Sequence, residues 1–251
     1  MINILISGAN GRMGKKVYEA CAKNEGVLAV CGVDLIENLS GDFKIYSSFS
    51  DVCEKIDVII DFSAKANLKN VIDFCLKTGA KAILCATGYD QADIDLIKET
   101  SKKVAMFRSS NMSLGVNILI NLIKNACLSL KGYDIEIIEK HHNKKVDAPS
   151  GTAVMMANAV KEVLPEKYEI YGREGFVGKR NENEIGIHAV RGGNIVGEHD
   201  IIFAGENEVI TLSHSASDRA MFAEGAIKAA KFMAKQKIGL FDMQDVIKED
   251  A

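Results

Sequence analysis

Short apolar runs alternate with amphipathic patterns over the first 107 residues. The runs have the length of β-strands and lie at 2–7, 27–33, 57–62, 81–86 and 104–107. Between them, apolar side chains recur every three or four residues, which predicts helices over 13–23, over 68–75 and around 94–97. Strands that alternate with helices are typical of a parallel, doubly wound sheet, so we expect an α/β domain of this class.

The pattern changes after residue 113. A helical stretch at 116–130 precedes an alternating strand at 133–139, and further strands, separated by glycine turns, are predicted at 185–190, 195–204 and 208–213. The stretch 217–237 predicts a long amphipathic helix. We therefore expect a second, smaller α+β domain with a mixed sheet over 114–219. The first domain then spans 1–113 and is completed by the C-terminal segment 220–251.

Composition and charge exclude several classes of protein. The 251 residues carry 31 Lys and Arg against 34 Asp and Glu, a net charge of −3, and 47% are hydrophobic. This balance is typical of a globular protein with a core, and not of a nucleic-acid-binding protein with a basic surface. No apolar run approaches the about 18 residues that cross a bilayer. The six cysteines form no C-x-x-C pair, so we expect buried thiols in a cytoplasmic protein and no metal site.

A glycine-rich turn follows the first predicted strand. It reads Gly8-Ala9-Asn10-Gly11-Arg12-Met13-Gly14 and leads into the first predicted helix. Glycines in such a turn let the backbone approach a pyrophosphate, whose charge then meets the N–H groups of the helix start. Asp34, at the end of the second predicted strand, can accept hydrogen bonds from an adenosine ribose. The spacing is G-x-x-G-x-x-G in place of G-x-G-x-x-G. We favour a Rossmann-like dinucleotide site, and the alternative is a glycine turn that binds another ligand.

Asp34 also bears on which cofactor is bound. Its carboxylate would repel a 2′-phosphate, and the next residue, Leu35, cannot clamp one, so NADH is favoured. Arg12 and Lys15 lie close in the sequence and leave NADPH as the alternative. The turns at 62–64 and 86–88 follow later strands, where an open sheet binds its ligand. We expect them near the nicotinamide, and ordinary loop chemistry is the alternative.

The loop predicted from His141 to Ala153 carries the densest chemistry of the chain. It contains two imidazoles, two ammonium groups and a carboxylate, followed by Pro149-Ser150-Gly151-Thr152 at a predicted helix start. Ser150 is a good N-cap, and the N–H groups of the helix start form an anion site that Lys144 or Lys145 would complete. A neighbouring imidazole can deliver a proton near neutral pH. The stretch suits a small anionic substrate that is protonated while it is reduced; the alternative is a solvated cationic loop before a capped helix.

These stretches resemble the dihydrodipicolinate reductase family, also called 4-hydroxy-tetrahydrodipicolinate reductases, of the diaminopimelate route to lysine. The family's loop signature matches Glu139-x-His141-His142-x-x-Lys145-x-Asp147-Ala148-Pro149-Ser150-Gly151-Thr152-Ala153. The glycine turn at 8–14 resembles the family's nucleotide turn. The segment Gly239-Leu240-Phe241-Asp242-Met243, near the C-terminus, also resembles the family. The resemblance runs along the whole chain.

The resemblance implies a two-domain NAD(P)H-dependent reductase, usually a homotetramer, that acts on a small cyclic dicarboxylate. It makes His141 the proton donor and Lys145 its catalytic partner. The substrate would be held by His142, Gly151 and Thr152. The cofactor would be held by Gly8, Ala9, Asn10, Gly11, Arg12, Met13, Asp34, Ala86, Thr87, Gly88, Ser109, Ser110, Asn111 and Met112. Leu35 stands where some members carry Arg, and Ala64 where some carry a basic residue, so NADPH contacts at these two positions are not expected.

Two other classes of protein share part of this pattern. A different nicotinamide enzyme, such as an amino-acid or homoserine dehydrogenase, would share the first domain and lack the run from His141 to Ala153. A dinucleotide-binding sensor without enzymatic activity would need the glycine turn and no proton donor. The His-His-Lys run beside an anion site favours the reductase over both, and neither a nucleic-acid partner nor a membrane is expected.

Overall fold

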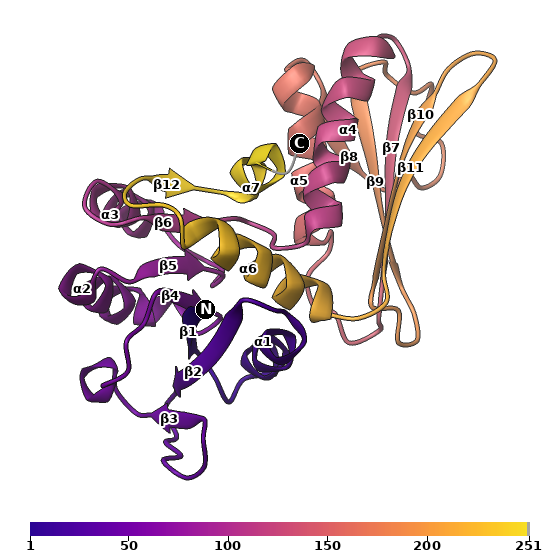
Figure 1. Ribbon diagram of the computed structural model, residues 1–251. Helices are drawn as coiled ribbons and strands as arrows, with labels where there is room; N and C mark the ends of the chain where they lie inside the picture. The colour runs from indigo at the N-terminus through magenta and orange to yellow at the C-terminus, as the bar shows by residue number, and fades with distance from the viewer. Residues whose placement is uncertain (250–251) are drawn as a thin grey trace. The chain divides into compact units, whose positions relative to one another are not determined.

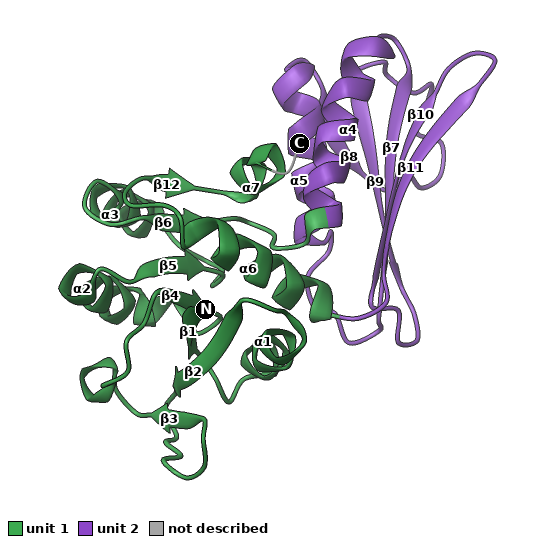
Figure 2. Cartoon of the chain, viewed as in Figure 1, with its two compact units in different colours: residues 1–114, 219–251 green, residues 115–218 purple. Residues whose placement is uncertain are grey.

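The computed structural model describes residues 1–249 (Figure 1). The chain divides into two compact units, coloured separately in Figure 2: unit 1 contains residues 1–114 and 219–251, and unit 2 contains residues 115–218. The C-terminal segment thus belongs to the same unit as the N-terminal half. The last two residues of the expected segment 220–251 lie outside the described residues.

Unit 1 is built on one parallel sheet of seven strands, which confirms the predicted doubly wound α/β class. The strand order is β12-β6-β5-β4-β1-β2-β3. It reverses between β1 and β4, the point at which sheets of this class bind their ligands. Two short edge strands, β3 and β12, were not expected from the sequence. The strands are β1 (Ile2–Ser7), β2 (Val27–Val33), β3 (Lys44–Tyr46), β4 (Val58–Asp61), β5 (Lys81–Leu84), β6 (Met106–Arg108) and β12 (Leu240–Phe241).

Helices cover both faces of this sheet. One apolar cluster packs beneath α1 (Arg12–Lys23), α6 (Ala220–Met233) and α7 (Met243–Glu249), and the opposite cluster lies beneath α2 (Leu68–Thr78) and α3 (Gln91–Ser101) (Figure 1). Two short 3-10 helices span Phe49–Asp51 and Lys65–Asn67. The helix expected over 217–237 is shorter than predicted, because the chain turns after Met233 and Gly239, with φ +125°, leads it into β12.

Unit 2 is a mixed sheet with two helices packed on one face, as the sequence predicts, and the sheet has five strands in place of the four expected. The strand order is β11-β10-β7-β9-β8, with β7 antiparallel to β10 and parallel to β9. Alternate residues of β7 are buried against α4 (Leu114–Ser129) and α5 (Gly151–Val163). The short strand β8 was not expected. The strands are β7 (Asp134–His141), β8 (Tyr168–Tyr171), β9 (Glu184–Arg191), β10 (Gly197–Ala204) and β11 (Val209–Ala216).

Strand β7 extends two residues beyond the predicted strand and ends at His141. The prediction that His141 lies in a loop was wrong. The alternation of buried and exposed residues continues to the end of the strand, because His141 pairs with Arg191 of the neighbouring strand. His141 therefore stands at the end of a paired strand, and the loop begins at His142.

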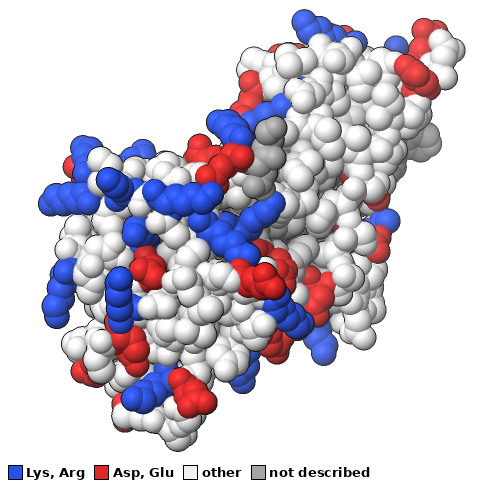
Figure 3. All heavy atoms as spheres, viewed as in Figure 1, with Lys and Arg blue, Asp and Glu red and all other residues white. Residues whose placement is uncertain are grey.

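Basic and acidic side chains are interspersed on the face of unit 1 drawn in Figure 3. The face of unit 2 in that view carries few charged side chains. Within residues 1–249, no helix is long and apolar enough to cross a membrane. The same residues contain no group of three or more His, Cys, Asp and Glu side chains arranged to hold a metal ion.

Candidate active site

The glycine turn of unit 1 is held against the end of β2 by a backbone hydrogen bond. Gly8 adopts φ +80°, and its N–H donates to the carbonyl of Val33 at 2.9 Å. A Cβ on Gly14 would lie 2.2 Å from the carbonyl oxygen of Gly8, so only glycine allows the helix to start this close to the strand. Helix α1 then begins after Gly11 without a side-chain cap, which leaves the N–H groups of its first turn available to an anion.

Asp34 lies beside this turn, at the end of β2. Its Oδ2 accepts a hydrogen bond from the N–H of Asn10 at 2.8 Å, and its Oδ1 accepts one from the N–H of Leu35 at 2.7 Å. A carboxylate has about four lone-pair directions, so Asp34 braces the turn and retains capacity for a further donor. The Leu35 side chain is 95% exposed.

Three more turns of unit 1 follow the carboxyl ends of β4, β5 and β6. Residues 86–88 follow β5, and residues 109–112 follow β6, where the Ser109 hydroxyl donates to the carbonyl of Asn111 at 2.8 Å. After β4, the hydroxyl and N–H of Ser63 both donate to the buried Asp61 carboxylate, at 2.5 and 3.1 Å. Burial raises the pKa of Asp61. Because the strands are parallel, the structure brings these turns to the same edge of the sheet as the glycine turn.

In unit 2, His141 is held by a fully buried carboxylate, that of Glu139 on the same strand. Glu139 Oε2 lies 2.7 Å from His141 Nδ1, and Arg191 of β9 donates to both carboxylate oxygens at 2.7 Å. The N–H of Ser150 donates to Oε1 at 2.9 Å. Burial by itself would raise the pKa of Glu139, but the hydrogen bonds from Arg191, His141 and Ser150 outweigh it and hold that pKa below its usual value.

Ser150 links this carboxylate to the start of α5. Its hydroxyl accepts from the N–H of Ala153 at 3.2 Å, which confirms the predicted N-cap, and lies 2.8 Å from Nε2 of His199. His199 is buried on β10, and its ring meets that of His141 edge-on, with centroids 5.1 Å apart. Burial, with a smaller contribution from the charge of His141, lowers the pKa of His199 to about 4.

The remaining loop residues lie between β7 and α5. Lys145 Nζ contacts both carboxylate oxygens of Asp147 at 2.8 Å, and this hydrogen bond lowers the pKa of Asp147. Lys144 is exposed. His142 and Thr152 are half-buried, and Gly151 is the exposed first residue of α5.

Arg191 and His199 of this cluster were missed in the sequence, and so was Gly197, where a Cβ would lie 3.0 Å from Nε2 of His141. They lie on β9 and β10, which the fold places on either side of β7. The only local signal was Gly192-Gly193, read as a turn; its first N–H donates to the carbonyl of His141 at 2.9 Å. Pairing between strands about fifty residues apart leaves no local pattern, so spacing alone does not find these residues.

Models of the two halves of one enzyme family match the chain. The model for the N-terminus of dihydrodipicolinate reductase matches residues 2–112, and the model for its C-terminus matches residues 115–247. The chain belongs to the dihydrodipicolinate reductase family. This confirms the resemblance seen in the sequence and excludes the dehydrogenase and sensor alternatives.

Relatives of known name agree with this membership. The 4-hydroxy-tetrahydrodipicolinate reductase of Caldanaerobacter subterraneus subsp. tengcongensis is 50% identical over 250 residues, 99% of each chain. That of Clostridium tetani is 44% identical over 97% of this chain and 96% of its own. The dipicolinate-bound dihydrodipicolinate reductase of Paenisporosarcina sp. TG-14 shares the fold, with a TM-score of 0.82 and 24% identity over 96% of this chain and 97% of that chain.

Membership of this family shows the class of reaction and the pathway. The chain is an NAD(P)H-dependent oxidoreductase of the diaminopimelate route to lysine. Unit 1 supplies a fold that binds dinucleotides, and unit 2 supplies a histidine beside a helix N-terminus.

Proposed function

We propose that the chain reduces the cyclic imine formed from 4-hydroxy-tetrahydrodipicolinate to tetrahydrodipicolinate, with NADH as the preferred cofactor. Unit 1 binds the dinucleotide, and unit 2 binds the substrate and makes the contacts between subunits. The observation that carries the proposal is the buried carboxylate of Glu139, which joins His141 and the N-terminus of α5 in one hydrogen-bonded cluster. This cluster combines a proton donor with an anion site, and reduction of an anionic imine needs both.

The cofactor fits unit 1 on two observations: the uncapped start of α1 and the close approach that Gly8 and Gly14 allow. When bound, the reduced nicotinamide supplies the hydride. The residues proposed to hold the cofactor are Gly8, Ala9, Asn10, Gly11, Arg12, Met13, Asp34, Ala86, Thr87, Gly88, Ser109, Ser110, Asn111 and Met112.

The preference for NADH follows from the charge beside the turn. The Asp34 carboxylate accepts backbone N–H groups and stays near the glycine turn, where a ribose hydroxyl can donate to it. A 2′-phosphate would be repelled by the same carboxylate. The neighbouring Leu35 offers no positive charge to offset that repulsion.

The substrate site of unit 2 is proposed around the start of α5. Its first N–H groups, together with the ammonium of Lys145, provide positive charge for a carboxylate. The Asp147 carboxylate holds the Lys145 ammonium within the loop, and a substrate carboxylate would compete for the same ammonium. His142, Gly151 and Thr152 complete the proposed contacts. The relative that is bound to dipicolinate supports a cyclic dicarboxylate as the ligand class.

His141 is proposed to donate the proton, with Lys145 as its catalytic partner. Negative charge develops on the substrate during reduction, and a protonated imidazole can neutralise it by donating a proton. The strand and the Glu139 contact fix the imidazole. Lys145 binds and polarises the substrate next to it.

The test is a rate measurement with both cofactors. The purified protein is mixed with freshly prepared condensation product of aspartate semialdehyde and pyruvate, and the loss of reduced nicotinamide is followed by absorbance. We expect rapid oxidation, with a higher kcat/KM for NADH than for NADPH. A higher kcat/KM for NADPH would contradict the role given to Asp34 and Leu35.

A homotetramer in the cytoplasm is also proposed. The face of the unit 2 sheet opposite α4 and α5 carries half-buried or exposed apolar residues such as Ile138, Val190 and Ile202, which suits contact with a second copy. The six cysteines are free thiols, which suits a reducing compartment. The expectation that all are buried was wrong for Cys53, which is exposed. Light scattering tests for four chains of 27.3 kDa each, and cell fractionation tests the location.

A further inference from the structure

We infer that Glu139, braced by Arg191, is a positioning residue that keeps a proton on Nδ1 of His141, so that Nε2 is the nitrogen that gives its proton to the substrate. This inference rests on the proposed function and deepens it, because it names the proton-carrying atom and the residues that select it. Neither Glu139 nor Arg191 needs to touch the substrate in this role.

The hydrogen bonds around Glu139 determine the tautomer. Oε2 accepts from Arg191 Nη1 at 2.7 Å and lies 2.7 Å from His141 Nδ1; Oε1 accepts from Arg191 Nη2 at 2.7 Å and from the Ser150 N–H at 2.9 Å. An ionised carboxylate only accepts hydrogen bonds. Nδ1 must therefore be the donor in its contact with Oε2, in the neutral imidazole and in the imidazolium alike.

Arg191 keeps the carboxylate charged and in place. Glu139 is fully buried, and a buried carboxylate without a partner would take up a proton and could then donate to the imidazole. The two-pronged contact with Arg191 prevents this and fixes the carboxylate plane. Nη2 of Arg191 also donates to the carbonyl of Asp147 at 2.7 Å, which holds the loop after β7 against the Glu139–Arg191 pair.

The opposite nitrogen, Nε2, is left open. No described residue forms a hydrogen bond with it, and the position facing it is a glycine. A Cβ on Gly197 would lie 3.0 Å from Nε2 and 3.4 Å from the adjacent ring carbon Cδ2. Any other side chain at position 197 would therefore press on the nitrogen that has to reach the substrate. The hydrogen bond at Nδ1 and the absence of a side chain facing Nε2 at position 197 are two independent observations, and both select Nε2 as the proton-donating atom.

The neighbouring histidine does not compete for this role. His199 faces the His141 ring from β10, and its Nε2 is engaged by the Ser150 hydroxyl at 2.8 Å. Its pKa of about 4 keeps it uncharged near neutral pH. Of the other charged groups on the loop, Lys144 is exposed, and Lys145 and Asp147 contact each other.

The proton transfer balances with these assignments. His141 starts as an imidazolium with one proton on each nitrogen. The Nε2–H bond breaks, and a new bond forms between that proton and the substrate atom that carries the negative charge left by reduction. The neutral imidazole that remains keeps its proton on Nδ1, against Glu139, and a solvent proton restores the starting state at Nε2.

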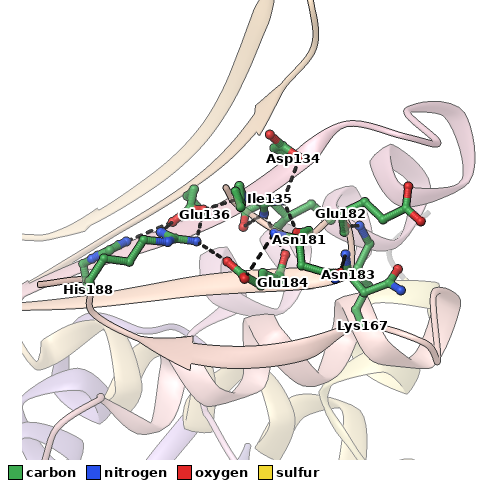
Figure 4. Close-up of polar contacts among 11 residues, drawn as sticks. Asp134, Ile135, Glu136, Lys167, Asn181, Glu182, Asn183, Glu184 and His188 are labelled. Carbon is green, nitrogen blue, oxygen red and sulfur yellow. Dashed lines mark hydrogen bonds and ion pairs between the residues drawn. The ribbon is translucent and has the colours of Figure 1, made fainter. Parts of the chain in front are cut away.

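Unit 2 contains a matched control with the opposite geometry. His188 Nε2 lies 2.9 Å from Oε2 of Glu136, which also accepts from Arg173 at 2.9 Å (Figure 4). Here too an arginine-braced carboxylate holds an imidazole, but it holds the other nitrogen. The same reasoning therefore predicts that neutral His188 carries its proton on Nε2.

Nitrogen NMR of the imidazoles tests the tautomers directly in the wild-type protein. The five histidines are assigned by single His→Gln variants, and the ring nitrogen shifts are followed from about pH 5 to about pH 9. We expect neutral His141 with its proton on Nδ1 and neutral His188 with its proton on Nε2. A neutral His141 protonated on Nε2 would overturn the inference.

Kinetics then separate positioning from general stability. We expect Glu139→Gln to lower kcat by about 10²-fold with KM changed by less than about threefold, because ground-state contacts with the substrate remain. Glu136→Gln removes the matched carboxylate and should keep kcat within about threefold of the wild type. Gly197→Ala should lower kcat while the proton stays on Nδ1 of His141. A folded Glu139→Gln variant with wild-type kcat would overturn the inference.

The two proposals fail in different ways. The NMR measurement needs neither substrate nor cofactor, so it gives a result for His141 even if Glu139→Gln does not fold. A wild-type protein that does not oxidise reduced nicotinamide with the imine contradicts the proposed function and leaves the tautomer result unaffected. An active wild-type enzyme with the other tautomer contradicts only the inference.

Discussion

Removal of the Glu136 carboxylate should abolish a large part of the pH dependence of stability in unit 2. Burial by itself would raise the pKa of Glu136, but hydrogen bonds from Arg173, His188 and Arg180 outweigh it and lower that pKa to about 2 (Figure 4). The ordinary value is 4.5. Because the folded state prefers the charged form, the stabilisation is fully present above about pH 4.5 and is lost as the pH falls through about 2.

The size of this effect follows from the difference between the two pKa values. At about 1.4 kcal/mol per pH unit, the lowered pKa corresponds to about 3 kcal/mol of unfolding free energy. The Glu136 side chain is 21% exposed, so solvent screens the interaction less than it screens a surface ion pair. Glu136→Gln removes the titrating proton and keeps the size of the side chain.

Urea unfolding followed by circular dichroism measures this dependence. Wild type and Glu136→Gln are compared between about pH 6 and about pH 2, and the wild type should lose about 3 kcal/mol more than the variant over that range. Glu25→Gln, at an exposed position of unit 1, is the control and should follow the wild type. Equal pH dependence in wild type and Glu136→Gln would refute the reasoning.

Three further predictions concern the two proposed binding sites. Lys145→Ala should raise KM, lower kcat and weaken dipicolinate binding by about 10- to 100-fold, because a charge-assisted hydrogen bond is lost; unchanged dipicolinate affinity by calorimetry would argue against the proposed contact. Gly14→Ala places a Cβ 2.2 Å from the Gly8 carbonyl oxygen and should weaken NADH binding by more than about 10-fold, as read by nicotinamide fluorescence; wild-type affinity would contradict the role of the turn. Leu35→Arg puts a cation beside Asp34 and should raise the ratio of kcat/KM for NADPH to that for NADH by about 10-fold; an unchanged ratio would exclude Leu35 as a determinant of cofactor choice.

Elements with a strong local signal were predictable from the sequence. Strands β1 and β2 have the bounds expected from their apolar runs, and Ser150 caps α5 as its residue type predicts. The edge strands β3 and β12 were not predictable, because three and two residues are too few to show a periodic pattern, and the two strands form by pairing with β2 and β6.

In the candidate site, too, residues with a local sequence signal were predicted and residues brought in by strand pairing were not. The residues proposed to carry the chemistry, such as His141 and Lys145, lie in one continuous motif. Residue types singled out this motif, and the family resemblance assigned the roles within it. The residues that hold them, such as Arg191 and His199, approach from other strands of the sheet and were missed. His141 itself was placed in a loop, because the alternation of its strand continues through Lys140 into polar residues that look like the start of a loop.

The most direct test of the account compares wild type with His141→Gln in the reductase assay. Both proteins are shown to bind NADH, and the loss of NADH with freshly prepared imine is then followed at saturating substrate. We expect turnover by the wild type and a kcat lower by about 10²- to 10⁴-fold in the variant, with a much smaller change in KM. A change confined to KM, or equal kcat in the two proteins, would contradict the assignment of His141 as the proton donor.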